Sequence, residues 1–293
     1  MGDSCCNNRS IGAVRNLIAE ALPGTFVFSL ATGRGAAGDT ESSFFGNVNE
    51  QVENVCNALA NITELRNGYN GVGFSQGGQF MRALVERCQH RGPRMHTLVT
   101  LGGQHQGVMN VPLCWNPSFN ATPTYLCRAM QSVLGWGAYL PWIRDHVIQA
   151  QYFKDPWRMA DYLRHNAFLA DINNERGAKN ALYRENLVSL ERLVLVRFSE
   201  DYTVVPRDSA WFAFYDGKKL QGMRDTALYQ EDWIGLRELD ERGRVVFDEI
   251  PGAHMHFTLQ YFQEHVVDRY LKGSKHGFDS MSGKLPQALA AAQ

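Results

Sequence analysis

Segments with helical spacing of apolar residues alternate along this chain with short continuous apolar runs. Apolar side chains fall three and four positions apart over residues 11–22 and again over residues 48–60, which predicts two helices with one buried face each. Between them, Pro23-Gly24 marks a turn, and the apolar run over residues 26–30 predicts a buried strand. The chain is therefore expected to begin as helix, strand, helix.

The alternation continues through most of the remaining sequence. Short apolar runs predict four further strands, and helical spacing predicts two further helices; in chain order these are strand 69–74, helix 79–88, strand 97–101, strand 193–198, strand 245–247 and helix 257–271. Strands that alternate with helices build a parallel sheet with helices on both faces. We therefore predict an α/β fold with a mostly parallel central sheet.

Residues 104–190 interrupt this rhythm with turns and helical segments and no convincing strand. We interpret them as a helical cap insertion over the carboxyl edge of the sheet, since no linker flanks them. Aromatic residues are frequent in this insertion, either as core packing or as the wall of an apolar substrate site. The predicted domain then spans residues 1–271, and residues 272–293 form a flexible tail rich in Gly, Ser, Lys and Ala.

Composition narrows the possible partners. The 293 residues are 44% hydrophobic, enough for a sizeable core, and 29 Lys and Arg balance 30 Asp and Glu. No basic stripe is present, which argues against a nucleic-acid partner. No apolar run reaches the roughly 18 residues of a membrane span, so we expect a soluble chain without a transmembrane segment.

Six cysteines accompany three glycosylation sequons, at Asn8, Asn61 and Asn120. Together they indicate an oxidising, secretory-route compartment. No apolar segment of a signal peptide follows Met1. We therefore expect that this numbering starts downstream of a signal peptide and of the first core strand.

The cysteine spacing leaves several pairings open. Cys56 and Cys88 fall in helical patterns and could be buried thiols, and Cys5 and Cys6 could bridge each other or pair elsewhere. No cluster has the spacing of a zinc site. We expect neither a metal nor a cofactor.

Ser75 is the candidate nucleophile. It lies in Gly73-Phe74-Ser75-Gln76-Gly77, after a predicted strand and before a predicted helix. This is the nucleophile elbow of the α/β-hydrolase fold, in which glycines flank the serine because side chains there would collide with the backbone. The motif alone is weak, but an acid and a histidine follow it in the chain order that this fold requires.

The acid and the histidine are assigned by their positions after late strands. Asp201 follows the strand that ends at residue 198; Asp208 is its rival, but we explain Asp208 as the cap of a short helix. His254 lies between the last strand and the closing helix, with His256 and His265 further on. We predict the triad Ser75, Asp201 and His254.

Two further features surround the elbow. The backbone N–H of Gln76 is expected to bind the oxyanion, and the second donor should come from a loop after an early strand, which here is Met1-Gly2-Asp3. His105 follows the strand 97–101, and we expect it to shape the substrate cleft without transferring protons.

Several segments together resemble the palmitoyl-protein thioesterase 1 family of lysosomal enzymes, which remove fatty acyl groups from cysteine. The resemblance runs from Met1 to about Leu271 and rests on these segments: residues 1–6, Gly73-Phe74-Ser75-Gln76-Gly77-Gly78-Gln79-Phe80, residues 102–108, residues 168–173 with 175–177, and residues 208–209 with 211–212.

This resemblance implies a specific function. It implies a serine thioesterase that hydrolyses palmitoyl thioesters of S-acylated proteins or peptides through an acyl-serine intermediate, in the lysosome or secreted, with the acyl groove under the insertion. It places the triad on Ser75, Asp201 and His254 and the oxyanion donors on the backbone of Met1 and Gln76. The disulfides that it implies are Cys5–Cys6, Cys56–Cys88 and Cys114–Cys127.

Three other functions fit the same residues. An acyl-CoA thioesterase and a lipase share this fold and triad. The third is an inactive lipid-binding homologue that lacks the first strand and hence a supported oxyanion loop.

Overall fold

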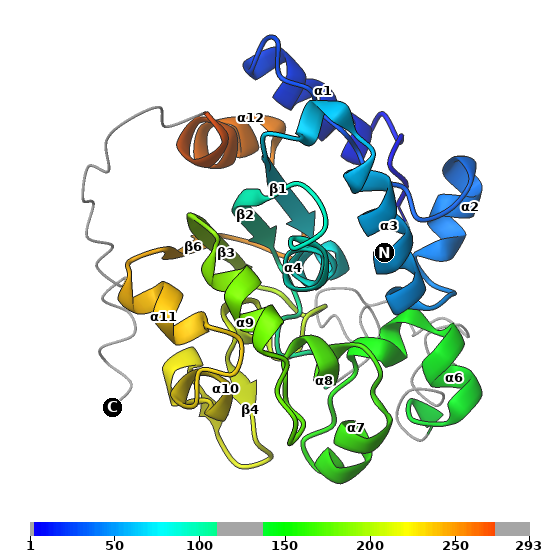
Figure 1. Ribbon diagram of the computed structural model, residues 1–293, viewed down its shortest axis with the longest axis vertical. Helices are drawn as coiled ribbons and strands as arrows, with labels where there is room; N and C mark the ends of the chain where they lie inside the picture. Colours follow the sequence, from blue (N-terminus) through cyan, green and yellow to red (C-terminus); the bar gives the residue numbers. More distant parts are fainter. Residues whose placement is uncertain (1–2, 110–136, 273–293) are drawn as a thin grey trace.

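Within the described residues, the core is a sheet of four parallel strands. The computed structural model describes residues 3–109 and 137–272. The strands lie in the order β1 (Tyr69–Phe74), β2 (Met95–Leu101), β3 (Arg192–Phe198) and β6 (Val245–Ile250) (Figure 1). All four were predicted from the sequence, so the α/β prediction is confirmed.

Side chains of these strands alternate between two apolar layers, because successive residues of a strand point to opposite faces. In β3, Leu193 and Leu195 belong to one buried cluster, while Val194 and Val196 belong to the other. Both faces are therefore buried, which explains why the strands are nearly continuous apolar runs in the sequence.

Helices cover both faces of the sheet (Figure 1). The first apolar layer is closed by α3 (Val48–Ala60), α4 (Gln76–Cys88) and α9 (Ala181–Val188). The second layer is closed by α1 (Ile11–Ala21), α12 (Leu259–Phe262) and the π-helix η5 (Gln263–Leu271). The predicted helices at residues 11–22, 48–60, 79–88 and 257–271 are thus confirmed, the last as two consecutive segments.

Shorter elements complete the described chain. The α-helices are α2 (Gly35–Ser42), α6 (Pro141–His146), α7 (Met159–His165), α8 (Leu169–Ile172), α10 (Ala227–Gln230) and α11 (Leu236–Glu241). The 3₁₀ segments are η1 (Thr63–Leu65), η2 (Ile148–Tyr152), η3 (Arg207–Trp211) and η4 (Met223–Asp225), and β4 (Phe214–Tyr215) pairs antiparallel with β5 (Leu220–Gln221).

The strand predicted over residues 26–30 is wrong. The segment has no regular secondary structure and pairs with no strand among the described residues. Phe26 and Phe28 keep 44% and 45% of their surface exposed, so the segment is not buried either. An apolar run satisfies the strand pattern, but a strand forms only where a neighbouring strand accepts its main-chain hydrogen bonds.

The described part of the predicted insertion, residues 104–109 and 137–190, contains helices and no strand of the sheet. Two isolated bridges involve it, one between Val108 and Phe153 and one between Val147 and Phe45. Its role as a cap stays a prediction, and the predicted tail lies outside the described residues apart from Lys272.

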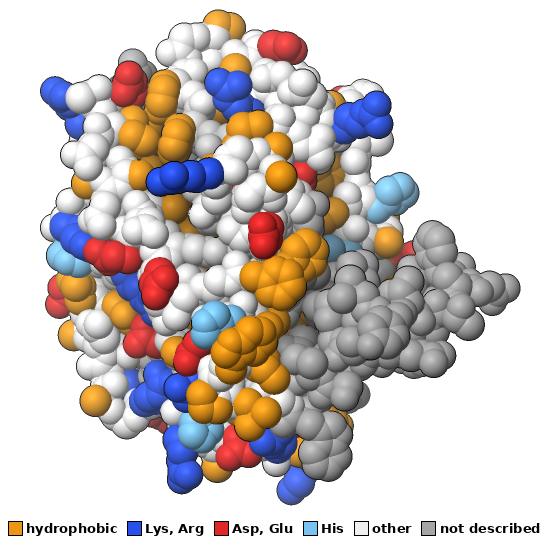
Figure 2. Space-filling view, turned by 90° about the vertical axis from the view of Figure 1, so that its right-hand side faces the viewer, with side chains coloured by type: hydrophobic (Ala, Val, Ile, Leu, Met, Phe, Trp, Pro, Cys, Tyr) orange, Lys and Arg blue, Asp and Glu red, His pale blue; other side chains and the backbone are white. Residues whose placement is uncertain are grey.

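The parallel sheet, the helices on both faces and the turn from β1 into α4 are those of an α/β hydrolase. None of the helices in the described ranges is long and apolar enough to cross a membrane. Acidic and basic side chains are interspersed over the face shown in Figure 2.

Candidate active site

Ser75 occupies the sharp turn between β1 and α4. Its φ of 52° and ψ of −124° are unusual for a residue other than glycine, which is the strained backbone of a nucleophile elbow. A Cβ on Gly73 would lie 2.4 Å from the carbonyl oxygen of Gly77, and one on Gly78 would lie 2.8 Å from Cα of Gly103. Nothing lies within 4 Å of a Cβ on Gly77, so the expected collision there is wrong, and the crowded second glycine is Gly78.

Three side chains from different loops form one hydrogen-bonded line. Nε2 of His254 lies 2.8 Å from Oγ of Ser75, and Nδ1 of His254 lies 2.6 Å from Oδ2 of Asp201. An imidazole held between a hydroxyl and a carboxylate can take the hydroxyl proton while the carboxylate fixes its tautomer. The structure thus brings together the three residues that the sequence analysis selected.

The Asp201 carboxylate is fixed by its own turn. Its Oδ1 accepts hydrogen bonds from the backbone N–H groups of Thr203 at 2.8 Å and Val204 at 2.9 Å, which leaves Oδ2 to face the imidazole. The side chain of Asp201 is 1% exposed and that of His254 is 12% exposed. The pair is therefore largely shielded from water, which strengthens the interaction between them.

The rival residues lie outside this hydrogen-bonded line. Asp208 forms an ion pair with Arg197. It lies inside η3, whose cap is Pro206 with no side-chain hydrogen bond, so our explanation of Asp208 as a helix cap is wrong. His265 stacks on Tyr261 with ring centroids 4.0 Å apart, and His256 lies exposed on the loop beyond His254.

Gln104 is a site residue that the sequence analysis missed. Its Nε2 donates a hydrogen bond to Oγ of Ser75 at 3.1 Å, and its backbone N–H donates to Oε1 of Gln79 at 3.0 Å. The side chain of Gln79 therefore holds the loop that carries Gln104 against the elbow. The position of Gln104 in the sequence could have indicated this role. Gln104 lies in the loop after β2, and the carboxyl end of β2 lies beside that of β1 in a parallel sheet.

Only one of the two predicted oxyanion donors lies in the described residues. Gln76 is the first residue of α4, so its backbone N–H has no acceptor within the helix. The side chain of Gln76 donates to the carbonyl oxygen of Ser43 at 3.1 Å and accepts from the hydroxyl of Tyr152 at 3.4 Å. Met1 lies outside the described residues.

His105 does not shape a cleft. The residue is fully buried, its Nε2 lies 3.0 Å from Oγ1 of Thr100, and its ring stacks on Phe212 with centroids 4.5 Å apart. Burial, with a smaller contribution from the Arg82 guanidinium, holds the pKa of His105 well below its ordinary value. His105 is thus a neutral core residue beneath the site.

The buried guanidinium of Arg82 connects helix α4 to the predicted insertion. Arg82 donates from Nη1 to Glu86 at 2.9 Å and to the carbonyl oxygen of Ile172 at 3.0 Å, and from Nη2 to Oδ1 of Asn173 at 2.7 Å. It also reaches the carbonyl oxygen of His105 at 3.4 Å. One side chain of α4 therefore fixes both the loop after β2 and the helix α8.

A cavity of about 970 Å³ opens beside the nucleophile. Ser75 and Gln76 line one part of it, together with Ile148, Tyr152 and Phe168 from the predicted insertion. Its lining is mostly apolar, and its volume lies at the upper end of the range of ligand sites. Most other lining residues come from the first 30 residues and from β1, so the acyl groove under the insertion stays a prediction.

The cysteines and sequons can be placed in part. Disulfides join Cys5 to Cys6 and Cys56 to Cys88, whereas Cys114 and Cys127 lie outside the described residues. Asn8 and Asn61 are exposed, and Asn120 lies outside the described residues. Within residues 3–109 and 137–272, no group of three or more His, Cys, Asp or Glu side chains is arranged to hold a metal ion.

Comparison with known proteins gives a consistent result. The family model described as palmitoyl protein thioesterase matches residues 1–254. The chain is 43% identical over 273 residues to palmitoyl-protein thioesterase 1 of Caenorhabditis elegans, covering 92% of this chain and 89% of the relative. It is 32% identical to palmitoyl-protein thioesterase 3 of Dictyostelium discoideum, covering 90% and 83%. It is also 31% identical to lysosomal thioesterase PPT2-B of Xenopus laevis, covering 64% and 62%.

Proposed function

The chain belongs to the palmitoyl protein thioesterase family, and from this premise we propose that it hydrolyses long-chain fatty acyl thioesters on cysteine through an acyl intermediate on Ser75. The observation that carries the proposal is the line of hydrogen bonds from Ser75 through His254 to Asp201, at 2.8 and 2.6 Å. This line leads from a shielded carboxylate to a hydroxyl that faces the cavity.

In the first half of the reaction, Oγ of Ser75 attacks the thioester carbonyl while Nε2 of His254 takes its proton. Asp201 holds Nδ1–H of the imidazole and stabilises the imidazolium that forms. The tetrahedral oxyanion faces the backbone N–H of Gln76, and the sequence prediction assigns the second donor to Met1. Collapse of this intermediate breaks the carbon–sulfur bond and leaves the acyl group on Ser75. The expelled cysteine sulfur takes the proton from His254 and departs as a thiol, which returns the imidazole to its neutral form.

In the second half, water takes the place of the attacking hydroxyl. His254 removes a proton from the water as it attacks the acyl-serine ester, and then returns a proton to Oγ of Ser75. A thiol with an ordinary pKa near 8.5 leaves more readily than an alcohol, so the base role of His254 dominates in the first half. Free fatty acid and the cysteine-containing product result.

The acyl chain is assigned to the part of the cavity beside Ser75 that Tyr152 and Ile148 line. Burial of a long acyl chain contributes about 0.8 kcal/mol per methylene, so the chain dominates recognition. The protein substrate then needs few contacts outside the cavity. The lysosomal name of one relative, the two disulfides and the exposed sequon residues support a lysosomal or secreted location.

The experiment compares wild-type protein with Ser75→Ala on a palmitoyl-cysteine peptide. We expect turnover to be lost while the circular dichroism spectrum is unchanged, because the hydrogen bonds of the serine hydroxyl within the described residues go to Gln104 and His254 in the site itself. Rates on palmitoyl-CoA and on a triglyceride, measured in parallel, separate the thioesterase proposal from an acyl-CoA thioesterase and a lipase. Retained turnover in Ser75→Ala would reject the proposal.

A further inference from the structure

Oγ of Ser75 has a second hydrogen-bond partner, to which the Ser-His-Asp mechanism gives no role. Besides Nε2 of His254 at 2.8 Å, Nε2 of Gln104 lies 3.1 Å from this oxygen. Gln104 is 1% exposed, so bulk water does not compete for its amide. The amide therefore contacts a reacting atom in a shielded part of the site.

The direction of this hydrogen bond follows from the donors and acceptors around Oγ. Nδ1 of His254 lies 2.6 Å from Oδ2 of Asp201, and a carboxylate only accepts, so Nδ1 carries the proton of the neutral imidazole and Nε2 accepts. The one proton of Oγ is thus directed at His254. Gln104 bonds to Oγ through its N–H group, because an amide oxygen in this place would face an oxygen with no proton left to donate.

Main-chain hydrogen bonds hold Gln104 in place. Its N–H donates to Oε1 of Gln79 at 3.0 Å, and its carbonyl oxygen accepts from the N–H of Gly107 at 3.0 Å. Further along the same loop, the N–H of Gln106 donates to Oγ of Ser209 at 3.0 Å. The amide is therefore oriented before a substrate binds, and it needs no reorganisation during the reaction.

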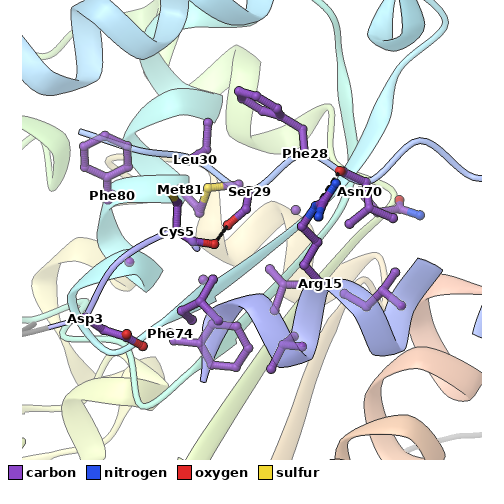
Figure 3. Close-up of a pocket in the computed structure, with 18 of the residues that line it drawn as sticks. Asp3, Cys5, Arg15, Phe28, Ser29, Leu30, Asn70, Phe74, Phe80 and Met81 are labelled. Carbon is purple, nitrogen blue, oxygen red and sulfur yellow. Dashed lines mark hydrogen bonds between the residues drawn. The ribbon is translucent and has the colours of Figure 1, made fainter. Parts of the chain in front are cut away.

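Gln104 approaches Oγ from outside the cavity to which the acyl chain is assigned. Figure 3 shows part of the cavity wall, with Phe74 at the end of β1 and Phe80 and Met81 on α4. Ser75 lies on this wall, whereas Gln104 is not among the described residues that line the cavity. A bound acyl chain therefore leaves the hydrogen bond from Gln104 to Oγ in place.

Oγ changes its role between the two halves of the reaction. In the first half it is the nucleophile, and a donated hydrogen bond stabilises the charge that develops on it but also weakens the lone pair that attacks. In the second half Oγ is the leaving group, and an alcohol oxygen leaves less readily than the thiol of the first half. A donor at Oγ therefore favours the second half more than the first.

We propose that Gln104 is a further catalytic residue, whose amide N–H stabilises Oγ of Ser75 as this oxygen leaves the acyl-serine ester; this role rests on the proposed function. As the carbon–Oγ bond breaks, Nε2 of His254 gives Oγ the proton that it took from water, and Gln104 keeps its own protons. The products are the fatty acid, the free hydroxyl of Ser75 and a neutral imidazole. Gln104 thus contributes through a hydrogen bond alone.

The test measures the two halves separately with a palmitoyl-cysteine peptide. Stopped flow follows release of the thiol, and mass spectrometry of the intact protein follows formation and decay of acyl-Ser75. Gln104→Met removes the donor and keeps the length of the side chain. Loss of one oxyanion-hole donor lowers kcat by about 10²–10³-fold, and Oγ also receives a proton from His254, so we expect deacylation to slow by about 10–100-fold and acylation by less than about threefold.

Gln89→Met is the matched control. Gln89 lies at the opposite end of α4 from Ser75, and its side chain donates to the carbonyl oxygen of Asn186 at 3.1 Å. This substitution removes the hydrogen bonds of a glutamine without reaching the site, so both rates should equal those of the wild type. The amount of thiol released in the first turnover counts the folded active sites, so a partly unfolded preparation does not change the ratio of the two rates.

Gln104→Glu gives a second signature. The new carboxylate has no proton to donate and repels negative charge on Oγ, whereas the protonated carboxyl again has a donor. We expect deacylation in this variant to speed up relative to the wild type as pH falls. A role of Gln104 in packing alone would not produce this pH dependence.

Three outcomes would overturn the inference. An unchanged deacylation rate in Gln104→Met would show that Oγ leaves without help from the amide. Equal slowing of acylation and deacylation would limit Gln104 to positioning Ser75. A wild-type protein whose Ser75 is never acylated would reject the proposed function itself, and this result is distinguishable from the first two, in which the wild type forms acyl-Ser75.

Discussion

At the scale of single residues, two aspartates lie between β3 and β4, and of these two Asp201 alone contacts an imidazole within the described residues. We predict that Asp201→Asn lowers kcat by about 10⁴-fold, because the amide cannot hold the required tautomer of His254. Asp208→Asn is the matched control, since it removes the same charge seven positions along and breaks only the pair with Arg197. Steady-state kinetics of both variants decide the assignment, which is wrong if Asp208→Asn is the inactive one.

The sequence was sufficient for the three residues of the hydrogen-bonded line, because strand order places the ends of β1, β3 and β6 at one edge of the sheet. The sequence was not sufficient to predict the orientation of the Gln104 and His105 side chains. Both follow β2 in one short loop, and nothing in the spacing says that the amide turns toward Ser75 while the imidazole turns into the core. That choice depends on Gln79 and Phe212, which lie far away in the sequence.

At the scale of elements, the approach of α4 to the loop after β2 depends on one glycine. We predict that Gly78→Ala lowers the free energy of unfolding by about 1–3 kcal/mol, because the new Cβ would lie 2.8 Å from the backbone of Gly103. Gly77→Ala, one position earlier on the same helix, meets nothing within 4 Å and gains helix propensity of up to about 1 kcal/mol. Urea unfolding of both variants measures the difference; equal losses would contradict this account of the packing.

A helix that is defined by signals within its own sequence was predicted well, whereas the strand predicted over residues 26–30 was not found. The helix α3 is an instance of the first kind, since its bounds follow from its apolar face and from Asn47, whose side chain accepts from the N–H groups of Asn49 and Glu50. Residues 26–30 have the composition of a strand, but strand formation depends on what lies beside them. The pattern of one segment does not contain that information.

At the scale of the whole molecule, stability should respond to pH through Glu86. This carboxyl is fully buried, and burial outweighs the attraction of Arg82 and raises its pKa from 4.5 to about 7. Between these two values the folded protein binds a proton at Glu86 that the unfolded chain does not bind. The free energy of unfolding therefore increases as pH falls from about 7 toward 4.5, by up to about 3 kcal/mol.

Denaturant unfolding at pH 7.5 and pH 5 measures this effect. We expect Glu86→Gln to remove most of the increase in the free energy of unfolding at pH 5, because the amide of Gln is neutral at both pH values and binds no proton. Glu241→Gln is the control, since this side chain is 68% exposed. An unchanged pH dependence in Glu86→Gln would contradict the assignment.

Activation of the Ser75 hydroxyl depends on the whole molecule, because residues from three distant segments must meet at one place. Reaction with a fluorophosphonate probe, followed by mass spectrometry of the peptides, tests it without any assumption about the acyl substrate. We predict a phosphonyl group on Ser75 in wild-type protein and loss of this labelling in His254→Ala. A folded protein that stays unlabelled would contradict this prediction and would favour an inactive lipid-binding protein. Labelling at another residue would also contradict it, because a different nucleophile would then be the activated one.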